Sequence, residues 1–143
     1  MDNLKLENQL CFPLYALSRQ ITNLYRPLLE ELALTYPQYL VMLLLWQHTQ
    51  LSVKEIGTRL WLDSGTLTPL LKRLEQKGLI ERKRDKQDER MVQILITDSG
   101  KELQTKAEKV PVALSQSLPI TREKGLQLVN ELNSVLKQLS VNE

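Results

Sequence analysis

The sequence predicts a mainly α fold with a small β-hairpin, and three observations support this fold class. Leucine is the main apolar residue, because the 143 residues include only one Phe and two Trp. Apolar residues recur at intervals of three or four over most of the chain, which is the helical period. The segment 79–97 differs, since two strand-like stretches flank a charged turn there.

The first predicted helix covers about residues 8–32, with Asn8 as its expected N-cap. Pro13 is tolerated if the regular helix begins close by, since the first turn does not use its missing N–H group. Pro27 implies a kink or a new start. The apolar positions of this helix are Leu14, Leu17, Ile21, Leu24 and Leu28.

A second helix is predicted from a T-x-x-Q pattern, Thr35 to Gln38, which is typical of a capping box. Pro37 lies in its first turn, where proline is favoured. The residues that follow, to about His48, are almost all apolar. We therefore expect this helix to lie at the centre of the core.

Two shorter helices are predicted next. A second capping box, Ser52 to Glu55, begins a helix that ends near Leu60, and Asp63 is a good N-cap for the following helix. Gly78 would end that helix in a left-handed conformation. Two short helices joined by a turn of about three residues are typical of a helix-turn-helix unit. The second helix has one apolar face with Leu67, Leu70, Leu71 and Leu74, and an opposite face with Gly65, Thr68, Pro69, Lys72 and Gln76.

The hairpin follows directly, with strands predicted at 79–84 and 91–97 and a charged tip at 85–90. A helix pair followed by a basic hairpin is the order of a winged helix-turn-helix. The C-terminal part contributes a helix capped by Thr97 and running to about Val110. Pro111 and Pro119 then break the chain before a last helix at 121–139.

The last helix has an apolar stripe with no obvious partner in so small a chain, formed by Leu126, Val129, Leu132, Leu136 and Leu139. We interpret it, together with the N-terminal helix, as a dimer interface. The predicted fold class is therefore mainly α with a small β-hairpin wing: a winged helix-turn-helix domain plus N- and C-terminal dimerisation helices.

Composition limits the function classes. The net charge is only +2, but six basic residues stand against two acidic ones in the segment 72–84. One cysteine cannot form an intrachain disulfide. One cysteine and one histidine are too few for the usual ligand set of a zinc site, so we expect no metal and no cofactor. No secretory signal and no membrane span is visible in the sequence, which favours a cytoplasmic protein with no membrane partner.

Residues on the exposed side of the second short helix suit double-stranded DNA, because a helix fits the major groove. Short hydroxyl side chains allow close approach to bases and phosphates, whereas basic ones supply charge. At the hairpin tip, an arginine can enter a narrow minor groove, and a carboxylate can hold it in place through a bidentate pair. The expected DNA-binding residues are Ser64, Thr66, Thr68, Pro69, Lys72, Arg73, Gln76, Lys86, Asp88 and Arg90.

The single cysteine, Cys11, is the second feature of interest. A thiol reacts as the thiolate, which a helix N-terminus or hydrogen-bond donors favour. With Asn8 as N-cap, Cys11 would be the third helical residue, and Tyr15 would follow one turn later on the same face. The alternative is that Cys11 is a small core residue between Leu10 and Phe12. Tyr25 and Tyr36 likewise have packing as their ordinary role.

Four segments resemble the organic-hydroperoxide-sensing (OhrR-type), one-Cys branch of the MarR repressors: LENQLCFPLYALSR, LTYPQYLVMLLLW, LDSGTLTPLLKRLEQKGLIERKR and DERMVQILIT. The match extends from about residue 4 to residue 100. It implies a single MarR-type domain over residues 1–143. Residues 36–98 would form the winged helix-turn-helix DNA-binding region, and 4–32 and 99–143 the helical dimerisation region.

The resemblance also implies a function: a homodimeric repressor that binds a pseudo-palindromic operator and releases it when an organic hydroperoxide oxidises Cys11. Tyr15, Tyr25 and Tyr36 match tyrosines around the sensing cysteine, the latter two acting across the dimer. Without a second cysteine, the sulfenic acid would form a mixed disulfide with a low-molecular-weight thiol, cyclise with a backbone nitrogen or over-oxidise. Three alternatives remain: a repressor controlled by a phenolic ligand, a one-Cys thiol peroxidase, and a helical interaction module that never touches DNA. We expect no enzymatic activity.

Overall fold

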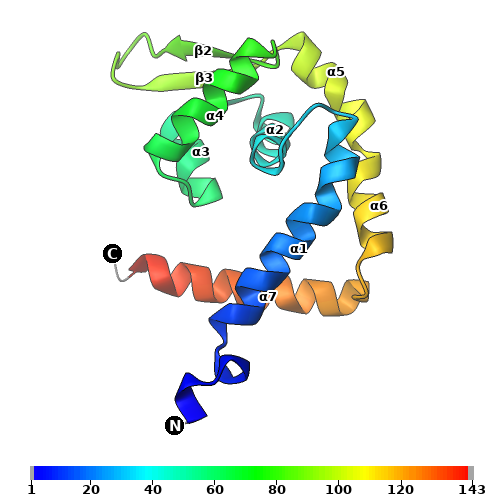
Figure 1. The fold of residues 1–143 in the computed structure, drawn as a ribbon. Coiled ribbons are helices and arrows are strands. Elements are labelled where there is room, and N and C mark those ends of the chain that lie inside the picture. Colours follow the sequence, from blue (N-terminus) through cyan, green and yellow to red (C-terminus); the bar gives the residue numbers. More distant parts are fainter. Residues whose placement is uncertain (1, 142–143) are drawn as a thin grey trace. The chain divides into compact units, whose positions relative to one another are not determined.

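The computed structural model describes residues 2–141 and divides into two compact units, residues 1–110 and 111–143. The mainly helical fold with a small sheet is confirmed (Figure 1). Its elements are, in chain order, the short 3-10 helices η1 (Asp2–Leu4) and η2 (Leu6–Asn8), then α1 (Cys11–Glu30), α2 (Tyr36–His48), β1 (Gln50–Ser52), α3 (Val53–Leu60), α4 (Ser64–Gln76), β2 (Ile80–Arg84), β3 (Val92–Ile96), α5 (Asp98–Ala107), α6 (Lys109–Ser117) and α7 (Arg122–Val141).

Helix α1 begins later than predicted. Asn8 ends η2 and its side-chain amide donates to the Asp2 carbonyl at 2.7 Å, so it does not cap α1. Cys11 is therefore the first residue of α1, not the third, and Leu10 precedes it without a side-chain cap. Pro13 lies in the first turn, as predicted. Pro27 lies inside the helix, which continues to Glu30, so the expectation of a new start there is wrong.

Helix α2 is the centre of the core, as predicted, and contacts α1, α3 and α4 (Figure 1). Its capping box is complete: the Gln38 N–H donates to the Thr35 hydroxyl at 3.4 Å, and the Thr35 N–H donates to the Gln38 side chain at 3.0 Å. These two bonds satisfy donors that the helix itself leaves free. The α2 side chains buried in the core are Gln38, Tyr39, Val41, Met42 and Leu45.

The helix-turn-helix unit formed by α3 and α4 is confirmed. Ser52 and Glu55 form the predicted capping box of α3, and the Asp63 carboxylate accepts the Thr66 N–H at 2.7 Å to cap α4. Trp61 makes the turn between them with a positive φ of 58°. A side chain at Gly57 would approach the Leu62 carbonyl oxygen to 2.8 Å, so this turn is tight against α3.

The sheet has three antiparallel strands in the order β1-β3-β2. The two strands of the hairpin were predicted, but β1 was not. Leu51 of β1 lies opposite Ile94, and Ile80 of β2 lies opposite Ile96, which places these apolar side chains in the core. Gly78 has the predicted positive φ, 73°, at the end of α4.

The C-terminal helices differ from the prediction in two respects. Thr97 caps α5 as expected, since its hydroxyl accepts the Gly100 N–H at 3.1 Å, but α5 ends at Ala107. Pro111 does not break the chain, because it lies in the first turn of α6, where no N–H is needed. Pro119 does lie between α6 and α7. No helix among residues 2–141 is both long and apolar enough to cross a membrane.

Candidate nucleic-acid interface and cysteine site

Helix α4 presents a polar face. Leu67, Leu71 and Leu74 are at most 1% exposed and anchor the helix to the core. The opposite side is accessible, and Asp63 caps the first turn of the helix. Of the predicted DNA-binding residues on this helix, Thr68 is half-buried and the others are exposed: Ser64, Thr66, Pro69, Lys72, Arg73 and Gln76.

The tip of the β2–β3 hairpin presents Arg90. Its side chain is 94% exposed, and its Nε lies 3.5 Å from the Asp88 carboxylate oxygen Oδ1. The same oxygen accepts the Arg90 backbone N–H at 3.1 Å. The predicted pairing of the two residues is therefore present, but not in the expected bidentate form, because one Oδ1 serves both contacts. The second predicted basic residue, Lys86, is also exposed.

A groove of about 710 Å³ joins these two features. It lies between α3, α4 and the hairpin, and its lining includes Ser64 and Thr68 from α4 and Asp88 and Arg90 from the hairpin. The structure therefore brings together predicted residues of two elements that are twenty or more positions apart in sequence. The groove also includes four polar residues that we did not predict as site residues: Ser52, Lys54, Thr58 and Arg82. Nothing in their local sequence distinguishes them as such.

Ion pairs neutralise part of the positive charge of α4 and the hairpin. Glu75 pairs with Arg82 at 3.2 Å, and Glu81 pairs with Lys83 at 3.4 Å. Lys77 donates to the Ala33 carbonyl and to the Gln38 side chain, so it connects α4 to the loop before α2. Within residues 2–141, the basic side chains of this region that form no ion pair are Lys72, Arg73, Lys77, Arg84 and Lys86.

The Glu75–Arg82 pair connects α4 to β2. Glu75 accepts the backbone N–H of Arg82 through Oε2 and the guanidinium Nε through Oε1, both at 3.2 Å. One carboxylate thus holds both the strand and its side chain, and Arg82 lines the groove. The pair therefore sets the position of the hairpin relative to the exposed face of α4.

We predict that Glu75→Ala weakens DNA binding severalfold, because the hairpin loses this contact with α4, and changes stability by about 1 kcal/mol or less. Quantitative DNA-binding titration and chemical denaturation measure the two effects. Glu81→Ala is the matched control, since it removes a carboxylate of β2 whose ion pair is with the exposed Lys83. Equal affinities for the two variants would contradict the prediction.

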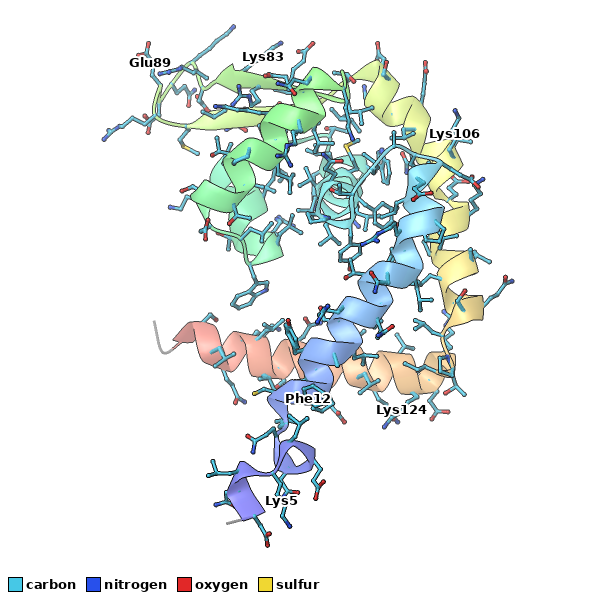
Figure 2. All side chains as sticks on the ribbon, in the orientation of Figure 1. Lys5, Phe12, Lys83, Glu89, Lys106 and Lys124 are labelled. Carbon is cyan, nitrogen blue, oxygen red and sulfur yellow. The ribbon has the colours of Figure 1, made fainter. Side chains whose placement is uncertain are left out.

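Cys11 is exposed and free, so its alternative role as a small core residue is wrong within this chain. Its apolar neighbours Leu10 and Phe12 are 76% and 44% exposed, at the end of α1 that Phe12 marks in Figure 2. Tyr15, one turn along, is 62% exposed, and the Arg19 guanidinium lies 5.5 Å from the centre of its ring. The cysteine thus begins a helix segment with an uncovered apolar surface.

The other two predicted tyrosines lie at the opposite end of α1. The rings of Tyr25 and Tyr36 are 4.7 Å apart, and Tyr39 lies 5.8 Å from Tyr25. Tyr25 lies fourteen positions after Cys11 in the sequence. At a rise of 1.5 Å per residue this is about 21 Å along the helix. One chain therefore does not bring Cys11 together with Tyr25 and Tyr36.

Burial raises the pKa of Tyr25 to about 12, and the adjacent Tyr36 and Tyr39 hydroxyls add to this effect. The folded chain therefore holds this proton more tightly than the unfolded chain, whose tyrosine pKa is 10.0. We predict that this contribution to the free energy of unfolding is complete below about pH 10 and is lost as the pH rises through about 12. Denaturation at several alkaline pH values measures it; a Tyr25→Phe variant with the same pH profile would contradict it.

Among residues 2–141, no group of three or more His, Cys, Asp or Glu side chains is placed to hold a metal ion. The arrangement instead combines a polar helix face and an exposed arginine beside one groove, with a single exposed thiol elsewhere in the same unit.

The chain is similar to known transcriptional regulators. The family model of the transcriptional regulators SarA/Rot matches residues 23–107. The organic hydroperoxide resistance transcriptional regulator of Bacillus subtilis (strain 168) is 53% identical over 138 residues, which cover 96% of this chain and 91% of that protein. Both the family and this relative are transcriptional regulators, and the relative matches nearly the whole chain.

Solved structures of AbfR, a protein of Staphylococcus epidermidis, are also similar. Reduced AbfR bound to DNA is 41% identical, with a TM-score of 0.79, and the match covers 96% of each chain. A disulfide-formed AbfR matches with a TM-score of 0.68, at 41% identity, over 96% of this chain and 94% of that one. The winged-helix fold and the family predicted from the sequence are thus confirmed. The chain belongs to the MarR family of winged-helix transcriptional regulators, together with the organic hydroperoxide resistance regulators.

Proposed function

We propose that this protein is a repressor that binds double-stranded operator DNA and releases it when an organic hydroperoxide oxidises Cys11. The groove that joins α4 to Arg90 is the main support for DNA binding. A second helix of a helix-turn-helix enters the major groove, and an arginine at a wing tip reaches the adjacent minor groove. The relatives support the same function, because they include an organic hydroperoxide resistance regulator and a DNA-bound AbfR.

We infer that the protein acts as a homodimer on a pseudo-palindromic site. Residues 36–98 would bind DNA, and 4–32 and 99–143 would form the dimer. Two helices support this assignment, because each has an exposed apolar row that water would otherwise contact. The rows are formed by Leu14, Leu17 and Leu24 on α1, with Leu10 just before this helix, and by Leu126, Val129, Leu132 and Leu139 on α7. A second copy would also supply the tyrosine pair that Cys11 lacks within its own chain.

The oxidation is a two-electron step. The Cys11 thiolate attacks the terminal oxygen of the hydroperoxide ROOH, the O–O bond breaks, and a sulfenic acid forms while RO⁻ leaves and takes a proton to become ROH. A low-molecular-weight thiol R′SH can then displace water from the sulfenic acid and leave a mixed disulfide. Since the chain has one cysteine, no intrachain disulfide can form. Hydrogen bonds from Tyr15, Tyr25 and Tyr36 would stabilise the thiolate.

A gel-shift titration on DNA from upstream of the protein's own gene tests the proposal. We expect the reduced protein to bind, and one equivalent of an organic hydroperoxide to weaken binding by about tenfold or more, within the usual range of allosteric coupling. Cys11→Ser should bind DNA and ignore the peroxide. No DNA binding would refute the repressor function.

The other outcomes identify the alternatives. Binding that ignores peroxide would contradict the sensing function and favour a repressor controlled by a phenolic ligand. Release of DNA by the Cys11→Ser variant would do the same. Repeated consumption of peroxide with a thiol donor would instead favour a thiol peroxidase, whereas consumption of one equivalent per chain agrees with a sensor.

A further inference from the structure

Aromatic side chains form a continuous row through the first compact unit. Tyr25 of α1 contacts Tyr36 and Tyr39 of α2, and the Tyr39 ring lies 6.3 Å from that of Trp46 in an edge-to-face arrangement. Tyr39 is 2% exposed and belongs to the core, and the other three rings are partly buried against it. The row extends over nearly the whole length of α2, from its first residue to within two residues of its last.

Trp46 ends this row with a directional contact. Its indole Nε1–H donates to the carbonyl oxygen of Gly100 in the first turn of α5, at 2.8 Å. Tyrosine at this place could not reproduce the bond with the same geometry, and phenylalanine would lose the donor. A hydrogen bond that fixes two helices in a packed interior constrains both their separation and their rotation.

Gly100 lies beside the start of β2 and the end of β3. A side chain at this position would come within 2.4 Å of the Leu79 carbonyl oxygen and 2.7 Å of Ile96 Cγ1. Thr97, three residues earlier, donates through its hydroxyl to the Gly78 carbonyl at 2.6 Å and through its N–H to the Leu79 carbonyl at 3.1 Å. The first turn of α5 therefore packs directly on the joint between α4, β2 and β3.

From these contacts, we propose that Trp46 is the positioning residue that couples the Tyr25–Tyr36 pair to the hairpin. A displacement of Tyr36 moves the first turn of α2, and the packed α2 transmits it through Tyr39 and Trp46 to Gly100. Because Gly100 packs closely on Leu79 and Ile96, the hairpin and its Arg90 shift with it. This inference rests on the proposed function, in which oxidation of Cys11 alters the surroundings of the tyrosine pair.

Trp46→Phe tests the coupling, because it keeps an aromatic ring and removes the N–H donor together with part of the indole ring. The quantity to measure is the ratio of operator dissociation constants after and before one equivalent of hydroperoxide. We expect the ratio of the variant to fall by about fivefold or more relative to wild type, the scale of a typical coupling. Trp61→Phe is the matched control, since it changes the other tryptophan, which is 52% exposed outside this row, and its ratio should equal that of wild type.

A second measurement decides the question if Trp46→Phe does not fold. In the Trp61→Phe variant, Trp46 is the sole tryptophan, so its fluorescence reports the Gly100 contact directly. We expect the emission to shift when Cys11 is oxidised. Unchanged emission, or a Trp46→Phe ratio equal to that of wild type, would overturn the coupling while leaving the sensor intact. Failure of the wild-type protein to release DNA would instead refute the proposed function.

Discussion

Replacing Arg90 by alanine is expected to lower the affinity for operator DNA by about ten- to a hundredfold, corresponding to about 1–3 kcal/mol. The side chain is 94% exposed, and among the described residues its one ion pair is with Asp88, so its loss removes the proposed DNA contact without removing any part of the core. The thermal stability of the variant should therefore equal that of the wild type. Fluorescence anisotropy with labelled operator DNA measures the affinity, and calorimetry measures the stability.

Lys106→Ala is the control for Arg90→Ala. Lys106 is an exposed basic residue on α5, away from the groove, and it forms no ion pair among the described residues. Both variants remove one positive charge, so both weaken the general attraction to DNA by the same mechanism. A loss of affinity equal to that of Lys106→Ala would show that Arg90 contributes only charge and that the wing makes no local contact.

Gly100→Ala is expected to lower the free energy of unfolding by about 3 kcal/mol, at the upper end of the cost of overpacking. The added Cβ would lie 2.4 Å from the Leu79 carbonyl oxygen, which is backbone and cannot rotate away. To make room, α5 must move off the joint, and the bond from the Thr97 N–H to the same carbonyl is then strained. Urea denaturation at a fixed protein concentration measures the loss.

Gly125→Ala is the matched control in the other compact unit. Its Cβ would meet nothing closer than Ile120 Cγ2, at 4.0 Å, and it lies within α7. Alanine favours a helix over glycine by about 0.5–1 kcal/mol, so this variant should be slightly more stable than the wild type. Similar losses from both substitutions would contradict the packing argument for Gly100.

Elements set by local chemistry were predictable from the sequence. The capping boxes at Thr35 and Ser52, the cap at Asp63 and the left-handed Gly78 depend on residues within four positions of one another. Their outcome does not depend on the rest of the fold. The same locality explains why the two helices of the helix-turn-helix and the strands of the hairpin were placed within a residue or two.

Features decided by tertiary contact were not predictable. Strand β1 has three residues, too few to show an alternating pattern, and it exists because β3 pairs with it. Asn8 has the right residue type for a cap, but its amide binds Asp2 instead. The Glu75–Arg82 pair and the contact of Trp46 with Gly100 join residues 7 and 54 positions apart, and no sequence period indicates such contacts.

The carboxylates at the tip of the hairpin have a consequence for the entropy of binding. Asp85 accepts the Gln87 N–H at 2.8 Å, Asp88 accepts the Arg90 N–H at 3.1 Å, and the Met91 N–H donates to the Asp88 carbonyl at 2.9 Å. The exposed loop is thus ordered by its own side chains before it meets a ligand. Ordering a loop on association costs conformational entropy, which a prearranged loop has already lost on folding. In the proposed complex with DNA, two negative charges that would repel phosphate therefore spare Arg90 a large entropic penalty.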